Sequence, residues 1–158
     1  MGTQEQRREY IDKIRNLPGQ LRELVHDLSD EQLTTPYLDG EWTVAQNIHH
    51  VADSHMNSYI RTKLILTEEY PTLRPYDQDA WAELVDADSA TLETSLMLLT
   101  GLHRRWVTLF ESLGEAEWRR AGLHPEVGEM TIDDILESYA AHGEAHIDQI
   151  QRTLAAQP

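Results

Sequence analysis

Apolar residues recur at steps of three and four along almost the whole chain, the spacing that places side chains on one face of an α-helix. The first such stripe consists of Tyr10, Ile14, Leu17, Leu21, Leu24 and Leu28. No internal repeat or low-complexity tract divides the 158 residues. The periodicity therefore predicts an all-α fold, built as a single domain over residues 1–158. A chain of this length can bury a sufficient core without a disulfide or a structural metal.

The stripes and their capping residues predict four long helices. The first runs through Pro18-Gly19, where we expect a kink rather than a chain reversal. The second is expected from about residue 42 to residue 66, with Thr43 or a neighbour as its cap, and the third from about 89 to 113. Thr131 has capping-box spacing to Asp134 and is expected to start the last helix, which runs to about residue 154.

The connections between these helices are long. Ser29 and Gln32 form a capping-box pattern, which predicts a short helix that ends before Thr35-Pro36. Residues 67–89 exceed the usual loop length, so we expect either a functional cover or a short helix over about 78–84. Residues 121–130 are expected to be a second connection. Four long amphipathic helices with two long connections indicate a four-helix bundle.

The charge balance narrows the classes of partner. Thirteen Lys and Arg residues against 28 Asp and Glu residues give a net charge of −15. Such a surface repels nucleic-acid backbones and anionic lipid headgroups, so we expect a small-molecule partner, no nucleic acid and no membrane. The polar amino terminus and the absence of long apolar runs favour a cytoplasmic location, and the lack of cysteine fits a reducing compartment.

Eight histidines stand out in this acidic chain. His142 and His146 are four residues apart in the predicted last helix, at the edge of its apolar face, so both imidazoles could bind one metal ion. Two half-exposed surface histidines would have the same spacing. The pair therefore indicates a metal site only if a third ligand lies nearby.

The third ligand must come from another helix, because two imidazoles rarely hold a divalent ion tightly. The predicted second helix offers His49, His50 and His55. His55 continues an apolar row, which favours a hydrogen-bonded core histidine, whereas His50 shares a polar row with Ser54, Asn57 and Arg61. Periodicity alone leaves the choice open. The other histidines, His26, His103 and His124, are expected to be ordinary helix or loop residues.

The run from Gly40 to Arg61 resembles the YfiT branch of the DinB/YfiT-like family of metal-dependent hydrolases. The resemblance continues, in the same order, through Arg74-Pro-Tyr76, 102–106, 124–126 and 142–147. It implies a four-helix bundle in which three histidines hold one divalent metal ion. One ligand comes from the second helix and an H-x-x-x-H pair comes from the last helix.

Carried over to this sequence, the resemblance places the metal on His50, His142 and His146, since His50 lies eight residues after Trp42. It also implies that the polar row of His50 faces a cleft, so that Asn57 and Arg61 contact the substrate. Zn²⁺ or Ni²⁺ is the expected ion, and the family resemblance implies a homodimer. No catalytic base can be assigned, because Asp53 and Glu144 point away from the ligand faces.

Three nitrogen ligands leave at least one coordination position open, as in catalytic metal sites. A water bound there would have its pKa lowered toward 7, which is the hydrolase hypothesis. A small-molecule thiol could bind instead, as in the bacillithiol S-transferases related to this branch. A metal-free helical interaction module is the alternative from another class. If the site exists, we expect metal release below about pH 6, where free histidine gains its proton.

Overall fold

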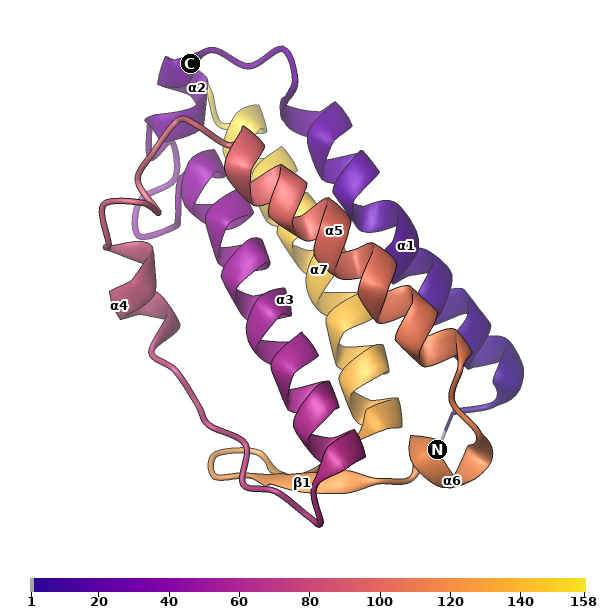
Figure 1. Cartoon of the computed structure of the whole chain (residues 1–158). Coiled ribbons are helices and arrows are strands. Elements are labelled where there is room, and N and C mark those ends of the chain that lie inside the picture. The colour runs from indigo at the N-terminus through magenta and orange to yellow at the C-terminus, as the bar shows by residue number, and fades with distance from the viewer. Residues whose placement is uncertain (1) are drawn as a thin grey trace.

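The computed structural model describes residues 2–158, and four long helices form an elongated bundle (Figure 1). These are α1 (Gln4–Val25), α3 (Val44–Thr67), α5 (Glu93–Glu111) and α7 (Ile132–Ala155). α1 packs against α5 and α7, and α3 packs against the same two helices. Each helix therefore has two neighbours around a shared interior, which confirms the predicted four-helix bundle.

Side-chain caps fix where the helices begin. Thr43 and Thr131 form capping boxes with Gln46 and Asp134 at the starts of α3 and α7. Each box satisfies two backbone N–H groups that the first helical turn would otherwise leave without a partner. α1 passes through Pro18 without interruption, so there is no chain reversal at that point.

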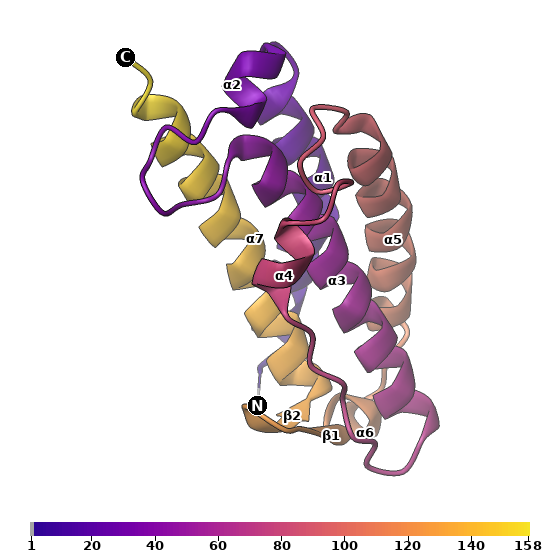
Figure 2. The same ribbon diagram turned by 90° about the vertical axis from the view of Figure 1, so that its left-hand side faces the viewer.

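Two short helices lie in the connections. α2 (Asp30–Thr34) starts at a Ser29 capping box, and α4 (Gln78–Ala82) lies within the long connection, both as predicted. Before α4, the chain runs back along the outside of the bundle from the end of α3 (Figure 2). The Gln46 side chain donates to the Ala82 carbonyl at 3.1 Å, which holds α4 beside the first turns of α3.

The chain between α5 and α7 differs from the expected open connection. It contains α6 (Glu115–Trp118) and a hairpin of β1 (Ala121–His124) and β2 (Gly128–Thr131). Four-residue strands are too short for a period-two pattern to show against the helical background. Gly128 has φ +89°, a conformation that glycine permits, and Gly122 lies so close to the Pro71 carbonyl that no Cβ would fit. α5 also begins four residues later than expected, at Glu93.

The buried apolar side chains form two clusters, one toward each end of the bundle. One includes Ile48, Leu99 and Ile150, and the other includes Ile14 and Trp106. Buried histidines and other polar side chains occupy the level between them, contributed by α3, α5 and α7. No helix within residues 2–158 is long and apolar enough to cross a membrane.

Candidate metal centre

Three histidines from two helices converge at one point in the middle of the bundle. One ring nitrogen from each of His50, His142 and His146 lies within 4.8 Å of the other two. The Nε2 atom of His142 is 3.2 Å from the Nε2 atoms of both His50 and His146. α7 brings its two histidines together through their four-residue spacing, and α3 packs against α7 and supplies the third.

All three side chains favour the neutral imidazole. Burial is the larger cause and the charge of His146 the smaller one that together lower the pKa of His50 to about 3. Burial is likewise the main cause that lowers the pKa of His142 to about 3, and the charges of His146 and His50 add to it. Burial lowers the pKa of His146 to about 4. Because only the neutral ring has a free lone pair, the site is in the metal-binding protonation state at pH 7.

Asn47 sets the tautomer of His146. The Asn47 amide nitrogen donates to the Thr43 carbonyl at 3.0 Å, so the Asn47 amide oxygen faces His146. That oxygen accepts a hydrogen bond from His146 Nδ1 at 2.8 Å. The proton of the neutral ring is therefore on Nδ1, and the lone pair of Nε2 points toward the other two histidines.

A row of hydrogen bonds sets the tautomer of His142 in the same way. His103 Nδ1 lies 2.6 Å from the Ile14 carbonyl, which can only accept, so Nδ1 carries the His103 proton. His103 Nε2 then accepts from His55 Nδ1 at 2.9 Å. His55 Nε2 in turn accepts from His142 Nδ1 at 3.2 Å, which leaves the lone pair on His142 Nε2.

This row touches all four long helices, since Ile14 is in α1, His55 in α3, His103 in α5 and His142 in α7. Burial lowers the pKa of His103 to about 4, and burial with the charges of neighbouring histidines lowers the pKa of His55 well below its usual value. The rings in the row are therefore neutral, as the tautomer assignment requires. Contacts from all four long helices therefore orient His142 as a candidate metal ligand.

The donor set fits a divalent cation. Two Nε2 lone pairs, those of His142 and His146, point at each other across 3.2 Å, a repulsive arrangement that a cation between them would turn into attraction. With His50, the site offers three nitrogen atoms as metal ligands. The two candidate ligands on α7, His142 and His146, each donate a hydrogen bond from Nδ1 to a fixed acceptor. Metal-binding histidines normally have such outer hydrogen bonds. The three residues could therefore hold Zn²⁺, Ni²⁺ or a related ion.

The three histidines open into a cavity of about 420 Å³. Trp42 forms one wall, with its ring centroid 4.5 Å from that of His50 and its plane nearly parallel to His146. The remaining lining residues are Gly40, Glu41, Gln78, Asp79 and Gln149. Glu41 is paired with Arg152 at 3.2 Å, which leaves Asp79 of α4 as the carboxylate at this cavity that has no ion-pair partner within residues 2–158.

The neighbouring histidines have other contacts. His49 lies between the Ser95 hydroxyl and the Ser89 carbonyl, 2.8 Å from each, so it connects α3 to the first turn of α5 and to the chain before that helix. His26 is exposed and pairs with Asp27. His124 is buried in β1, where its Nδ1 accepts from the Glu126 backbone N–H. None of these rings reaches the group of three.

The expected substrate-contacting residues lie outside the 420 Å³ cavity. Asn57 is half-buried, and its amide donates to the Asp53 carbonyl of its own helix at 2.9 Å. Arg61 is 9% exposed, and its Nη2 donates to the Arg74 carbonyl at 2.6 Å, beneath the chain between α3 and α4. Glu144 points away from the histidines and pairs with Lys13 at 3.1 Å.

Sequence reasoning missed the outer partners of the ligands. No sequence pattern points to Asn47. His55 is a hydrogen-bonded core histidine, as predicted, whereas the expectation that His103 is an ordinary helix residue is wrong, because His103 continues the row of hydrogen bonds. A signal was present, because His103 occupies an apolar stripe with Leu99 and Trp106 just as His55 continues an apolar row of α3. Two histidines on the inward faces of two helices can meet in a bundle interior. Gln78 and Asp79 of α4, which also line the cavity, have no sequence pattern that places them there.

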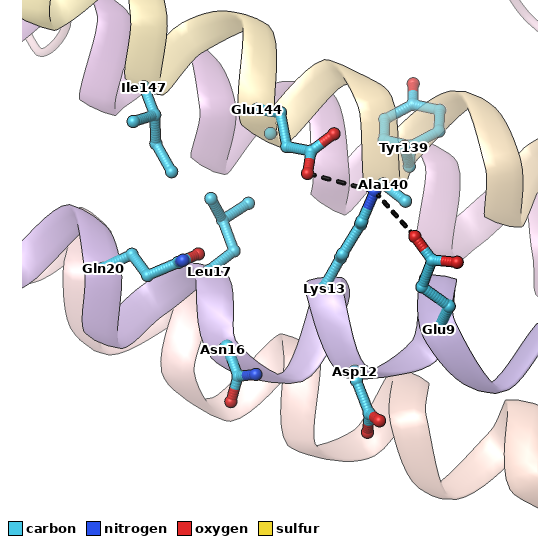
Figure 3. A pocket seen from close by; sticks show the side chains of 11 residues that line it. Glu9, Asp12, Lys13, Asn16, Leu17, Gln20, Tyr139, Ala140, Glu144 and Ile147 are labelled. Carbon is cyan, nitrogen blue, oxygen red and sulfur yellow. Dashed lines mark ion pairs between the residues drawn. The ribbon is translucent and has the colours of Figure 1, made fainter.

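A second groove, of about 470 Å³, lies between α1 and α7 and does not include the three histidines (Figure 3). Lys13 bridges Glu9 and Glu144 across this groove, at 3.3 and 3.1 Å. Leu17 packs there against Gly143, where a Cβ would lie 2.6 Å from a Leu17 methyl carbon. The groove therefore lies where α1 and α7 pack closely together, and its rim carries the charged side chains of Glu9, Lys13 and Glu144.

Comparison with known proteins gives consistent matches. Residues 14–150 match the DinB superfamily. The chain is 46% identical over 149 residues to a Bacillus subtilis protein named "Putative metal-dependent hydrolase YfiT", covering 94% of this chain and 84% of that protein. A protein of Oceanobacillus iheyensis with the same functional description is 47% identical over 142 residues, covering 90% of this chain and 82% of that one.

Two solved structures share the fold. YfiT from Bacillus subtilis, described as a probable metal-dependent hydrolase with an unusual four-helix bundle topology, superposes with a TM-score of 0.93 at 44% identity, over 97% of this chain and 88% of that chain. A mycothiol-dependent maleylpyruvate isomerase superposes with a TM-score of 0.70 at 16% identity, over 91% of this chain and 60% of that chain. At that identity the second match shows the fold alone.

Proposed function

The chain belongs to the DinB superfamily, and we propose that it is a metal-dependent enzyme that acts on a small molecule, with one divalent ion held by His50, His142 and His146. The observation that carries the proposal is the convergence of three neutral imidazoles whose Nε2 atoms face one another beside an open cavity. A metal-free interaction module would gain nothing from this arrangement. His50 Nε2 can donate to His142 Nε2, but the lone pair of His146 Nε2 faces that of His142, and a buried lone pair without a donor or cation is costly.

The proposed reaction is hydrolysis, as in the names of the relatives. A divalent ion at this site would lower the pKa of a water or thiol that binds to it. The chain itself contributes the neutral ligands, the Trp42 wall and a carboxylate at the mouth of the cavity. We propose Asp79 as the group that accepts the proton from the nucleophile, since Glu41 is already paired with Arg152.

Thiol transfer is the second candidate. One observation favours it, namely that a structure with this fold is that of a mycothiol-dependent enzyme. The chain has no cysteine, so the thiol would come from a second substrate, such as bacillithiol. We propose Zn²⁺ or Ni²⁺ as the ion in either case, because imidazole ligands suit both.

The two reactions are separated by loading metal-free protein with Zn²⁺ or Ni²⁺ and assaying two panels. One panel contains activated esters and amides in the absence of thiol, and the other contains a generic electrophile with bacillithiol or a surrogate thiol. Metal-dependent hydrolysis supports the hydrolase, and metal-dependent conjugation supports the transferase. If the folded, metal-loaded protein is inactive in both panels, that result would contradict the enzyme proposal.

We propose in addition that Asn57 and Arg61 contact the substrate and that the protein is a cytoplasmic homodimer. The polar row that both residues share with His50 on α3 supports the first part. The family resemblance supports the dimer, and the cysteine-free composition fits a reducing compartment. Size-exclusion chromatography with light scattering tests the dimer, and a monomer at micromolar concentration would contradict it.

A further inference from the structure

Arg61 differs from the other buried arginine of the described chain in having no carboxylate partner. Arg7 is 5% exposed and forms two hydrogen bonds with Asp133, at 2.6 and 2.8 Å, and another with Glu115. Arg61 is 9% exposed, and no ion pair within residues 2–158 includes it. A buried guanidinium without a counter-charge is costly, so its retention calls for an anion from outside the chain.

Three buried side-chain atoms within residues 2–158 lack a hydrogen-bond partner, and all three belong to this region. They are the Nε of Arg61, the Oγ of Ser58 and the hydroxyl of Tyr76. Ser58 is completely buried and lies one helical turn before Arg61 on the same face of α3. Each of the three atoms can donate a hydrogen bond. The Tyr76 hydroxyl has the Ser54 side chain within reach, whereas Arg61 Nε and Ser58 Oγ have no protein acceptor within residues 2–158.

Tyr76 connects this region to the metal centre. Burial raises the pKa of the Tyr76 hydroxyl, and Arg61 lies close enough to oppose that rise. Ser54 is also within reach of the hydroxyl, and Ser54 lies one turn after His50. His50, Ser54, Ser58 and Arg61 thus form one continuous face of α3 that runs from the candidate ligand to the guanidinium.

The length of this face sets the size of its ligand. Arg61 follows His50 by eleven residues, or about 16 Å along the helix axis. The Arg61 guanidinium contacts the Arg74 carbonyl, in the segment that leads from α3 back toward α4. An extended molecule of metabolite size could contact both places.

The surrounding charges favour a single negative charge on the ligand. Burial, with the nearby charge of Arg61, lowers the pKa of His124, so this ring adds no second cation. Asp53 lies near Tyr76, and the whole chain carries a net charge of −15. A dianionic phosphate would be repelled here more strongly than a carboxylate, which one guanidinium neutralises.

We propose that Arg61, Ser58 and Tyr76 form a binding site for a carboxylate of the substrate or cosubstrate, whose other end reaches the metal centre. This inference rests on the proposed function, because the metal centre proposed there determines where the reacting end of the substrate lies. Because the three atoms are buried beneath the chain over 74–77, the proposal requires this segment to move when the ligand enters. The segment lies between the contacts of Leu73 with β1 and of α4 with α3.

The test uses Co²⁺-loaded protein and a series of straight-chain thiols that end in a carboxylate, each paired with a thiol of equal length that ends in a hydroxyl. Binding at the metal is read from the thiolate-to-Co²⁺ absorption band. Binding at Arg61 is read from its Nε–H signal in NMR spectra of ¹⁵N-arginine-labelled protein, which is assigned by its loss in Arg61→Gln.

At the best chain length, we expect the carboxylate thiol to bind about ten- to a hundredfold more tightly than its hydroxyl partner and to shift the Arg61 signal. Arg61→Gln should abolish this preference by weakening the binding of the carboxylate thiol, and Tyr76→Phe should reduce it. Arg104→Gln removes an exposed positive charge on α5 and should leave the preference intact.

The two readouts separate the two proposals. An absorption band without carboxylate preference and without an Arg61 shift would overturn the carboxylate site while leaving the metal centre in place. An Arg61 shift without a band would support the carboxylate site and contradict thiol binding at the metal. No response in either readout, or an Arg61 shift with inorganic phosphate only, would overturn the inference.

Stability gives an independent check. Arg61→Gln removes an uncompensated buried charge, so the ligand-free variant should melt at the same temperature as the parent protein or higher. A clearly lower melting temperature would mean that protein groups already satisfy the guanidinium, which would overturn the inference.

Discussion

His142 Nδ1 lies 3.2 Å from His55 Nε2, and this contact connects a candidate metal ligand to a histidine that cannot itself reach the ion. His55 in turn contacts His103, whose Nδ1 proton is fixed by the Ile14 carbonyl. A backbone carbonyl of α1 thus determines which nitrogen of His142 is free to bind metal. His103 is therefore a positioning residue for the candidate metal centre, although it lies two hydrogen bonds away from it.

His103→Leu removes the acceptor for His55 and should weaken metal binding by about ten- to a hundredfold, the usual effect of losing an outer hydrogen bond to a ligand. Competition with a chromophoric chelator measures the affinity. Phe110→Leu, on the same stripe of α5 but without a histidine contact, is the control for a general loss of core packing. Equal affinities in both variants would contradict the positioning role.

Gly143 allows α7 to approach α1 beside the ligand His142. In Gly143→Ala the new Cβ would lie 2.6 Å from a Leu17 methyl carbon, so we expect a loss of about 1–3 kcal/mol in the free energy of unfolding. Gly101→Ala on α5 meets nothing within 4 Å and should stabilise the protein by up to about 1 kcal/mol. Urea denaturation measures both, and equal stability of the two variants would contradict the close packing.

Acid should destabilise the metal-free protein. Burial lowers the pKa of His50 and His142 to about 3 and that of His146 to about 4, against about 6.5 in the unfolded chain. The unfolded state therefore binds more protons between these values. Each histidine contributes a loss of up to about 1.4 kcal/mol per pH unit as the pH falls from 6.5 toward 4. Urea denaturation at several pH values measures the slope, and a flat profile would contradict the buried neutral rings.

The same pKa shifts revise the pH at which metal should be released. The sequence alone predicts release below about pH 6, the range of free histidine. Because burial keeps the rings neutral, we now expect the folded protein to retain its ion at pH 5. Dialysis at pH 5 and pH 6 followed by elemental analysis checks this. Loss of the ion near pH 6 from protein that is still folded would mean that the ligands titrate as exposed histidines.

Asp79→Asn should lower hydrolytic turnover about a hundredfold or more if this carboxylate accepts the proton, because general base catalysis contributes that much. Metal content should not change, since Asp79 lies at the cavity mouth and not among the three histidines. Asp77→Ala, which removes the side-chain oxygen that caps α4, is the control for a change in α4 itself. Equal activity of Asp79→Asn and the parent protein would exclude Asp79 as the base.

Much of the fold follows from the sequence because its signals are local. Capping boxes at Ser29, Thr43 and Thr131 mark helix starts that the structure confirms. The β-hairpin escaped prediction because its strands have four residues each and are held by a contact between Leu123 and Pro71, about fifty residues apart in the chain. Such a contact leaves no pattern in either segment.

The candidate site was predictable only in part. The spacing of His142 and His146 is a local signal, but the choice of His50 over His55 came from the family resemblance. The packing of α3 against α7 decides which face of α3 meets the pair, and one sequence does not show that packing. The lack of a carboxylate partner for Arg61 is likewise invisible in the sequence, where Arg7 and Arg61 are both arginines within a helix.

Metal content is the most direct test of the account. Protein prepared without an affinity tag should contain about one divalent ion per chain by elemental analysis and native mass spectrometry. His50→Ala and His142→Ala should lose that ion and remain helical, whereas His26→Ala, which changes an exposed histidine, should keep it. Folded parent protein that binds no Zn²⁺ or Ni²⁺, or a His142→Ala variant that retains a full complement of metal, would contradict the central claim.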